Sequence, residues 1–285
     1  MEIGNHLIGH QLQSVASTWD DNDTRLYAIA VGAGSADPLQ ELHFTTQNSL
    51  DVTQRVLPTF GVIQGCQVGI GGPLTELPDL DLSRMLHGHQ EIELHQDLPV
   101  AASVVTSGEI TAVWDKGKAT VMETETAITD AETGVRYVTS RQSLFFQGYG
   151  GWGGERGPRA ANAVPDAKPD LTLTFQTRAD QALLYRLTGD WNPLHSDPKY
   201  AQAAGFPRPI LHGLCTYGIV GRLLLNELGG GETSSLRSFG GRFSAPAYPG
   251  DDLTVNVWST GKEHTFVVTN QNDEVLLSNG SFATN

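Results

Sequence analysis

An aspartate and a histidine lie close together in the second half of the chain and could form an acid–base pair. Both belong to the stretch Asp190-Trp-Asn-Pro-Leu-His195. The Asn192-Pro193 pair inside it favours a turn, which would take the two side chains off a helical line and let them converge on one small volume. A carboxylate and an imidazole that face the same water molecule can move protons near neutral pH. The spacing therefore predicts acid–base chemistry at this turn.

A possible oxyanion donor follows in the sequence. The segment PRPILHG, residues 207–213, leads into an apolar run that we expect to form a long helix from about Gly213 to Leu228. Free N–H groups at a helix start can polarise a carbonyl and stabilise an enolate oxygen. A base, an acid and an oxyanion donor are what the addition of water to an α,β-unsaturated carbonyl requires. One group deprotonates the water, another protonates Cα, and the N–H donor stabilises the enolate.

The elements that must position these groups recur in two similar halves. Stretches rich in Val and Thr, separated by turn residues, predict strands over 108–115, 118–129 and 136–146, and again over 253–260, 265–270 and 274–282. Helix signals come before the strands. The carboxylates of residues 20–23 predict the start of a helix through 25–30, residues 179–187 predict another, and Asp197 with Pro198 predicts a short third. The pattern indicates an α+β fold with a buried helix against a curved antiparallel sheet.

A stretch rich in glycine and proline, residues 148–170, marks the clearest boundary between the halves. No Gly-Lys-Ser/Thr follows its glycines, so a linker is preferred to a phosphate-binding loop. We therefore expect an N-terminal half over 1–147, a linker over 148–170 and a catalytic C-terminal half over 171–285.

Composition narrows the classes of partner. The 285 residues include 18 Lys and Arg against 32 Asp and Glu, a formal net charge of −14. This balance lacks the basic footprint that a nucleic acid or an anionic membrane needs, so neither is expected as a partner. The two cysteines are too few for a disulfide scaffold. We see no secretory signal at the start and no apolar run of roughly 18 residues, which favours a cytoplasmic enzyme.

Three weaker patterns are better explained without a cofactor or a metal ion. The run Val31-Gly-Ala-Gly34 mimics a dinucleotide fingerprint but lacks its third glycine. The histidines at 87, 89 and 95 are not completed to a recognised metal set, and the carboxylates of residues 20–23 lack the glycine and closing glutamate of a calcium loop. The sequence predicts no bound cofactor and no metal.

The stretch around the acid–base pair resembles the signature of the MaoC-like, or hydratase 2, family. Tyr185 and the run Thr188–His195 match that pattern, and the resemblance covers nearly the whole chain, most closely to the hydratase 2 unit of peroxisomal multifunctional enzymes. Further matching segments are LPTFGVI (57–63), LHG (86–88), DKG (115–117), GGWGG (150–154), ILHGLCTYG and RFSAPAYPG. The resemblance implies a double hot-dog fold, two hot-dog halves in which the first half's helix is reduced. It also implies reversible hydration of trans-2-enoyl-CoA to (3R)-3-hydroxyacyl-CoA, with CoA as part of the substrate.

The same resemblance assigns roles to individual residues. Asp190 and His195 become the catalytic pair, Asn192 helps to orient it, and Gly213 supplies the oxyanion N–H. Four further residues are implied to hold acyl-CoA: His87, Gly88, Lys116 and Phe243. Lys116 could instead be a solvated turn residue, and Phe243 could be an ordinary core aromatic. His89 departs from the pattern, because relatives often carry a carboxylate after LHG.

Some alternatives remain open at this point. A hot-dog thioesterase or a non-catalytic acyl-thioester-binding protein would share the fold. The acyl group and the choice between CoA and a carrier protein are not fixed by the sequence. The family suggests a homodimer. Proline and repeated glycines over residues 57–73 disfavour a long helix in the first half, so this half is expected to form an apolar wall for the acyl group.

Overall fold

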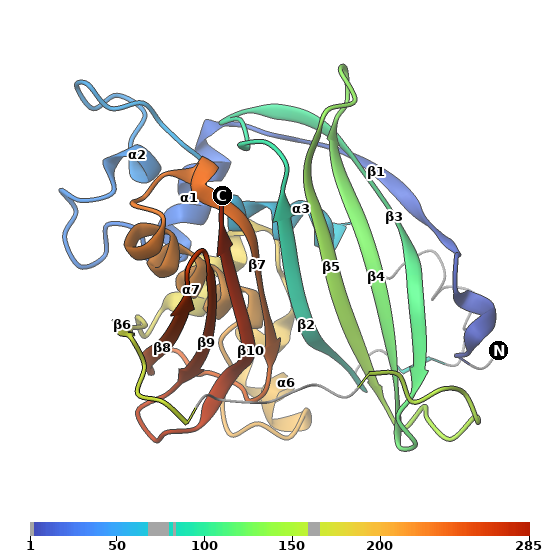
Figure 1. Cartoon of the computed structure of the whole chain (residues 1–285). Coiled ribbons are helices and arrows are strands. Elements are labelled where there is room, and N and C mark those ends of the chain that lie inside the picture. The colour runs from blue at the N-terminus through green and yellow to red at the C-terminus, as the bar shows by residue number, and fades with distance from the viewer. Residues whose placement is uncertain (1–2, 68–79, 82–83, 159–165) are drawn as a thin grey trace.

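Ten antiparallel strands form one continuous sheet in the described part of the chain, residues 3–67, 80–81, 84–158 and 166–285 of the computed structural model (Figure 1). The strands are β1 (Gln11–Trp19), β2 (Met85–Leu94), β3 (Ala102–Asp115), β4 (Ala119–Asp130), β5 (Arg136–Gln147), β6 (Leu171–Gln176), β7 (Leu236–Phe243), β8 (Asp252–Thr260), β9 (Glu263–Thr269) and β10 (Val275–Thr284). Their order in the sheet is β1-β3-β4-β5-β2-β7-β10-β9-β8-β6. Each half therefore contributes five strands in equivalent order, and β2 pairs with β7 where the halves meet.

Helices cover the inner face of this sheet (Figure 1). They are α1 (Asp21–Ala30), α2 (Leu42–Thr45), α3 (Gly61–Gln67), α5 (Gln181–Tyr185), α6 (Pro198–Ala203) and α7 (Gly213–Leu228), with 3-10 turns η1 (Asn5–Leu7), η2 (Pro58–Phe60), η4 (Arg186–Thr188), η5 (Pro193–His195) and η6 (Thr233–Ser235). An antiparallel sheet wrapped round helices in two equivalent halves is the expected α+β double hot-dog, which is confirmed. None of the helices in the described part of the chain has the length and apolar character needed to cross a membrane.

The central helix α7 lies where the sequence predicts it and is buried along most of its length. Two glycines permit this close packing. A Cβ on Gly221 would come within 2.6 Å of Thr59 and 2.9 Å of Phe239 on β7, and a Cβ on Gly218 would come within 2.6 Å of Tyr27 on α1. Gly221 thus lets the sheet approach, whereas Gly218 makes room for a helix of the other half.

Two helices begin where their N-cap residues predict. Asp20 caps α1 by accepting the N–H groups of Asn22 and Asp23. Asp197 caps α6 in the same way, with Pro198 at its first position. The helix expected over 179–187 is shorter than predicted: α5 covers five residues and continues as the 3-10 turn η4, which ends at Gly189 with φ of 120°.

Four strands were missed from the sequence: β1, β2, β6 and β7. Strand β2 contains Gly88 and two glutamates, Glu91 and Glu93. Its register against β5 also shifts between His87 and His89. Strand β3 begins at Ala102, earlier than predicted. A strand whose alternation is broken by such a shift gives no clear period-two signal.

The first half's helix is short where it is described. Helix α3 has 7 residues against 16 in α7. Its glycines mark close packing rather than open room, because a Cβ on Gly61 would lie 3.1 Å from Val138 and one on Gly65 would lie 3.0 Å from Ser140 Oγ. The glycines and proline at 69–73 lie outside the described residues.

Short stretches of sequence recur in the two halves, in and after helices α1 and α5. The pair Leu-Tyr at 26–27 in α1 corresponds to Leu-Tyr at 184–185 in α5, and the two tyrosine rings lie 6.2 Å apart. Further along, Asp37-Pro-Leu-Gln40 corresponds to Asn192-Pro-Leu-His195. The first copy thus ends in a glutamine where the second has its histidine.

A buried ion pair ties the first half to α7. Arg222 donates to Glu41 at 2.9 Å, and the side chains are only 6% and 14% exposed. Glu41 also accepts the Asn226 amide and the Gly34 N–H, while Arg222 Nε donates to Val31 O. Burial alone would raise the pKa of Glu41, but Arg222 and these donors outweigh it and lower the pKa.

Removing one partner of this pair should destabilise the fold strongly. Arg222→Met leaves the Glu41 carboxylate buried without its cation, which we expect to lower the free energy of unfolding by about 3–5 kcal/mol. Urea unfolding measures this loss, and the double variant Glu41→Gln/Arg222→Met should recover part of it. A loss for Arg222→Met within about 1 kcal/mol, as for an exposed pair, would contradict the assigned role.

Candidate active site

The predicted acid–base pair meets at one point, together with a third residue. One polar atom from each of Asp190, His195 and His212 lies within 4.8 Å of the other two. The turn between the first two forms as expected: Asn192 Oδ1 accepts the N–H of Leu194 at 3.0 Å, and the Asn192 N–H donates to Asp190 Oδ1 at 3.2 Å. Asn192 therefore fixes the turn from both sides.

His195 is held in the form that a general base needs. Its Nδ1 lies 3.0 Å from Ile210 O, and because a carbonyl oxygen can only accept, Nδ1 carries the proton. This leaves the Nε2 lone pair available to a water molecule. Burial lowers the pKa of His195, and the Ile210 carbonyl and Asp190 oppose this only in part. The imidazole is therefore neutral at physiological pH.

His212 is a site residue that the sequence reading missed. Its ring stacks on His195 with centroids 3.8 Å apart, and its Nε2 lies 3.3 Å from Asp190 O. Burial, with His195 as a further cause, lowers its pKa to about 3, so it stays neutral. The sequence signal that could have identified His212 is its position directly before the expected start of the long helix.

These three side chains are also the candidate metal ligands in the described part of the chain. Two neutral imidazoles and a carboxylate are ligand types that zinc accepts. The two imidazole rings stack with their planes 28° apart. The absence of a metal stays a prediction, and the mechanism below uses none.

The start of α7 lies beside this cluster, and two of the expected substrate-binding residues gather there. No side chain caps the first N–H groups of α7. A Cβ on Gly213 would lie 3.1 Å from the Phe243 ring, and that ring lies 4.9 Å from the ring of His87. Gly213, Phe243 and His87 therefore form one contact group from three different elements.

His87 enters from β2, just before the register shift at Gly88. Burial lowers the pKa of His87 to about 4, and its buried Nε2 has no hydrogen-bond partner among the described residues. A Cβ on Gly88 would lie 3.3 Å from Ser143 O, which explains the glycine by close approach of β5. His89 lies opposite Arg242 on β7, so the departure from the family pattern falls at the junction of the two halves.

Lys116 lies in the turn between β3 and β4 and is half-buried. It follows β3, and its Nζ donates to the carbonyls of Arg156 and Pro158. The neighbouring Asp115 accepts the N–H groups of Gly117, Gly151 and Gly153 at 2.7–2.8 Å, and these bonds lower its pKa to about 2. Hydrogen bonds to Asp115 thus join the segments DKG (115–117) and GGWGG (150–154) into one unit, which we call the clasp. Contact of Lys116 with the substrate stays a prediction.

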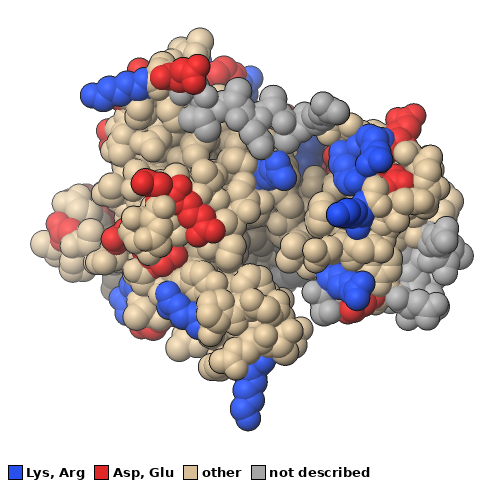
Figure 2. All heavy atoms as spheres, turned by 90° about the horizontal axis from the view of Figure 1, so that it is seen from below, with Lys and Arg blue, Asp and Glu red and all other residues tan. Residues whose placement is uncertain are grey.

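Basic side chains gather at the end of the molecule where this clasp lies. Figure 2 looks onto that end and shows Lys and Arg on the side of the first half, next to a hollow in the surface. Arg156 lies against Gly117, and Arg84 lies against Gly148. In a chain with a net charge of −14, this is a local positive region at that end of the molecule.

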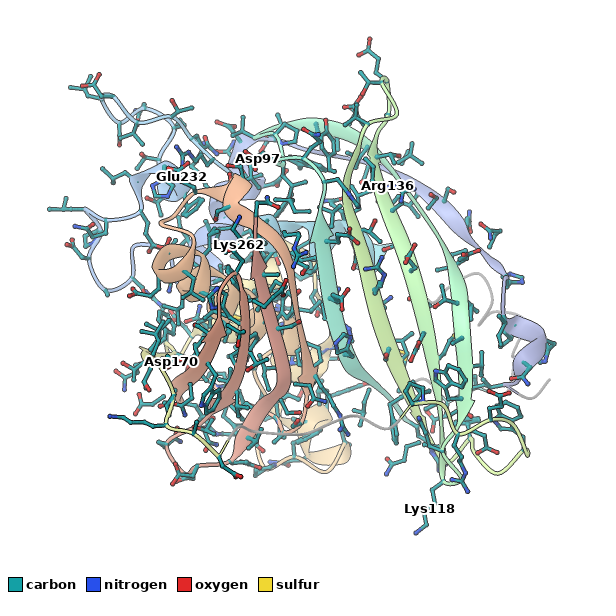
Figure 3. The ribbon with its side chains drawn as sticks, in the orientation of Figure 1. Asp97, Lys118, Arg136, Asp170, Glu232 and Lys262 are labelled. Carbon is teal, nitrogen blue, oxygen red and sulfur yellow. The ribbon has the colours of Figure 1, made fainter. Side chains whose placement is uncertain are left out.

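The opposite end carries a separate pocket with different chemistry. A cavity of about 260 Å³ is lined by residues that include Arg55, Asp97 and Glu232. Figure 3 shows Asp97 and Glu232 at this end, with Lys118 at the other. Arg55 is paired with Glu232 at 2.6 Å, and none of the predicted site residues lines this cavity. It has no acid–base pair.

Known protein families match both halves of the chain. The model of the MFE-2 hydratase 2 N-terminal domain matches residues 17–148, and the model of the MaoC-like domain matches residues 159–279. The chain is 41% identical to enoyl-CoA hydratase ChsH3 and 44% identical to 3-hydroxyacyl-thioester dehydratase Y, both from Mycobacterium tuberculosis. These alignments cover 95% of both chains for the first, and 91% of this chain and 89% of the relative for the second.

A solved structure shows the same fold. The crystal structure of a MaoC-like dehydratase from Phytophthora capsici superposes with a TM-score of 0.87 at 27% identity, covering 99% of this chain and 98% of that one. The matches to both domain models follow each other in the same order as the two halves of the sheet. The chain therefore belongs to the MaoC-like hydratase 2 family, with an MFE-2 hydratase 2 N-terminal domain followed by a MaoC-like domain.

Proposed function

We propose that this protein catalyses the reversible hydration of trans-2-enoyl-CoA to (3R)-3-hydroxyacyl-CoA in acyl-CoA metabolism. The observation that carries the proposal is the neutral His195, whose Nε2 is left free beside Asp190 and the uncapped start of α7. Relatives named enoyl-CoA hydratase and 3-hydroxyacyl-thioester dehydratase support the same reaction.

The geometry suits a mechanism in which one water molecule is shared by Asp190 and His195. The pair removes a proton from this water while its oxygen bonds to Cβ of the enoyl thioester. The π electrons move towards the thioester oxygen, where the Gly213 N–H stabilises the enolate. Protonation of Cα from the pair then completes the addition of H and OH, and no other reactant is consumed.

The basic end of the molecule supports a CoA thioester as the substrate. The phosphates of CoA need cations, and the acidic chain offers a local group of them at the end where β3 turns into β4. Two of the three Lys116 N–H donors are used by main-chain carbonyls, so Arg156 and Arg84 are the stronger phosphate candidates in this region. We also expect a cytoplasmic location and a homodimer. Size-exclusion chromatography with light scattering tests the oligomeric state.

A thioesterase and a non-catalytic binding protein remain as alternatives because they share the fold. One assay separates the three. With crotonyl-CoA, a hydratase lowers the enoyl-thioester absorbance without releasing thiol, a thioesterase releases free CoA thiol, and a binding protein does neither.

Loss of either member of the catalytic pair should abolish most turnover. We expect Asp190→Asn and His195→Gln each to lower kcat for crotonyl-CoA hydration by about 10²–10⁴-fold, because the shared water loses its acid or its base. His264→Gln, which replaces a buried histidine on β9, should keep the normal rate. Near-normal rates in either site variant, with an unchanged melting temperature, would rule out this pair.

The product should be the (3R) alcohol. The family resemblance implies this product, and one acid–base pair among the described residues favours attack on one face of the double bond. Coupling the reaction to dehydrogenases specific for (3R)- or (3S)-hydroxyacyl-CoA measures this directly. Reduction of nicotinamide with the (3S)-specific enzyme alone would contradict the proposed function.

The activity should persist to lower pH than an unperturbed histidine would allow. Burial holds the pKa of His195 below its ordinary value of 6.5, and only neutral imidazole accepts a proton. The acid limb of kcat/KM against pH, which reports the free enzyme, should therefore have its midpoint below about 6.5. The unfolded chain binds this proton more readily, so the free energy of unfolding should also fall as the pH drops through this range. A kinetic midpoint above about 6.5 would contradict the neutral-base assignment.

A further inference from the structure

Two hydrogen bonds join the turn that carries the acid–base pair to the segment that leads into α7. His195 Nδ1 donates to Ile210 O at 3.0 Å. In the other direction, His212 Nε2 lies 3.3 Å from Asp190 O, and it must carry the proton because a main-chain oxygen can only accept. Each segment therefore contributes one imidazole N–H and one main-chain oxygen.

The ring of His212 is held by two neighbouring rings. It stacks on His195 with centroids 3.8 Å apart, and the ring of Tyr185 lies 4.9 Å away. The residue is only 1% exposed. This packing fixes the orientation of the ring, so the Nε2–H group has one direction, towards Asp190 O.

Neither ring nitrogen of His212 is available to the substrate. Nε2 uses its proton for Asp190 O, and Nδ1 is buried without a hydrogen-bond partner among the described residues. His195 differs, because its Nε2 lone pair is left free. His212 is therefore suited to hold the acid–base pair rather than to exchange protons itself.

The first half of the chain shows what the corresponding position contains where there is no acid–base pair. Phe60 directly precedes the first residue of α3, as His212 directly precedes the first residue of α7. The Phe60 ring lies 5.6 Å from that of Tyr27, which corresponds to Tyr185 in the second half. Packing at this position is thus satisfied by phenylalanine.

A histidine is less favourable than phenylalanine for the stability of such a position. The buried Nδ1 of His212 loses its hydrogen bond to water on folding and gains none from the described part of the protein. A phenylalanine has no such atom. The presence of histidine in the half that contains the acid–base pair therefore points to a task for its Nε2–H donor.

We propose that His212 is a positioning residue that fixes the acid–base pair against the start of α7, where Gly213 is the proposed oxyanion donor. This inference rests on the proposed function. Gly213 follows His212 directly, so the hydrogen bond from His212 to Asp190 O sets the carboxylate against the oxyanion donor. The addition of water needs both groups in place at once, and a misplacement of about 1 Å can lower a rate by about 10²-fold.

His212→Phe tests the hydrogen bond and leaves the packing in place. This variant puts the first-half residue at the second-half position, keeps a ring against His195 and removes the donor. We expect kcat for crotonyl-CoA hydration to fall by about 10–100-fold. KM should stay within about twofold, because His212 does not touch the substrate. The melting temperature should not fall, because the unpaired nitrogen is removed with the donor.

His212→Gln is the matched variant. The amide nitrogen of glutamine can take the place of the imidazole Nε2 and donate to Asp190 O, although the ring is lost. Its kcat should therefore lie well above that of His212→Phe. Equal losses in the two variants, or a normal kcat in His212→Phe, would overturn the assigned role. A loss in His212→Gln as large as that in Asp190→Asn would also overturn it, since His212 would then be moving a proton.

Phe60→His is the control in the other half. It buries an imidazole at the corresponding position, where no acid–base pair is present, so it should lower the melting temperature and leave kcat near normal. A loss of kcat equal to that in His212→Phe would show that a change at either helix start acts through the fold alone, which contradicts the inference.

A measurement without substrate separates the inference from the function on which it rests. Long-range proton–nitrogen NMR spectra of the wild-type protein report which ring nitrogen of each histidine carries the proton. We expect His212 to be protonated at Nε2 and His195 at Nδ1. A proton on Nδ1 of His212 would overturn the inference. Failure of the wild-type protein to hydrate crotonyl-CoA, with the expected tautomers present, would instead contradict the proposed function.

Discussion

The candidate site depends on the antiparallel pairing of β2 with β7. This pairing joins the halves through the pairs from His89↔Arg242 to Glu93↔Ser238. Because the strands run in opposite directions, the start of β2 meets the end of β7, which places His87 of the first half against Phe243 of the second. A slip of one residue would turn each of these side chains to the other face of the sheet. The first half therefore shapes the site although the acid–base pair belongs to the second.

The two halves share one architecture but carry different residues at corresponding positions. The repeat that ends in His195 in the second half ends in Gln40 in the first, and Phe60 precedes Gly61 where His212 precedes Gly213. Phe60 instead packs edge-on against Trp19 and Tyr27. The first half therefore has no acid–base pair at the positions that correspond to those of the second.

Much of the fold and the position of the candidate acid–base pair could be predicted from local signals. The caps at Asp20 and Asp197 and the turn at Asn192-Pro193 act within a few residues, so the sequence shows them directly. The stacking of His212 on His195 could not be foreseen, because it depends on how the start of α7 meets a turn from a separate segment.

Burial gives the site its chemical character. It lowers the pKa of His87, His195 and His212, so three histidines are present without positive charge. In the proposed reaction, the negative charge of the enolate would be stabilised by fixed dipoles, for which the uncapped N–H groups of α7 are the candidates. Dipoles in a desolvated site act more strongly than they would in water and need no rearrangement during the reaction. In the proposed reaction, Asp190 and the neutral His195 would move the protons, while the N–H groups at the start of α7 would stabilise the enolate oxygen.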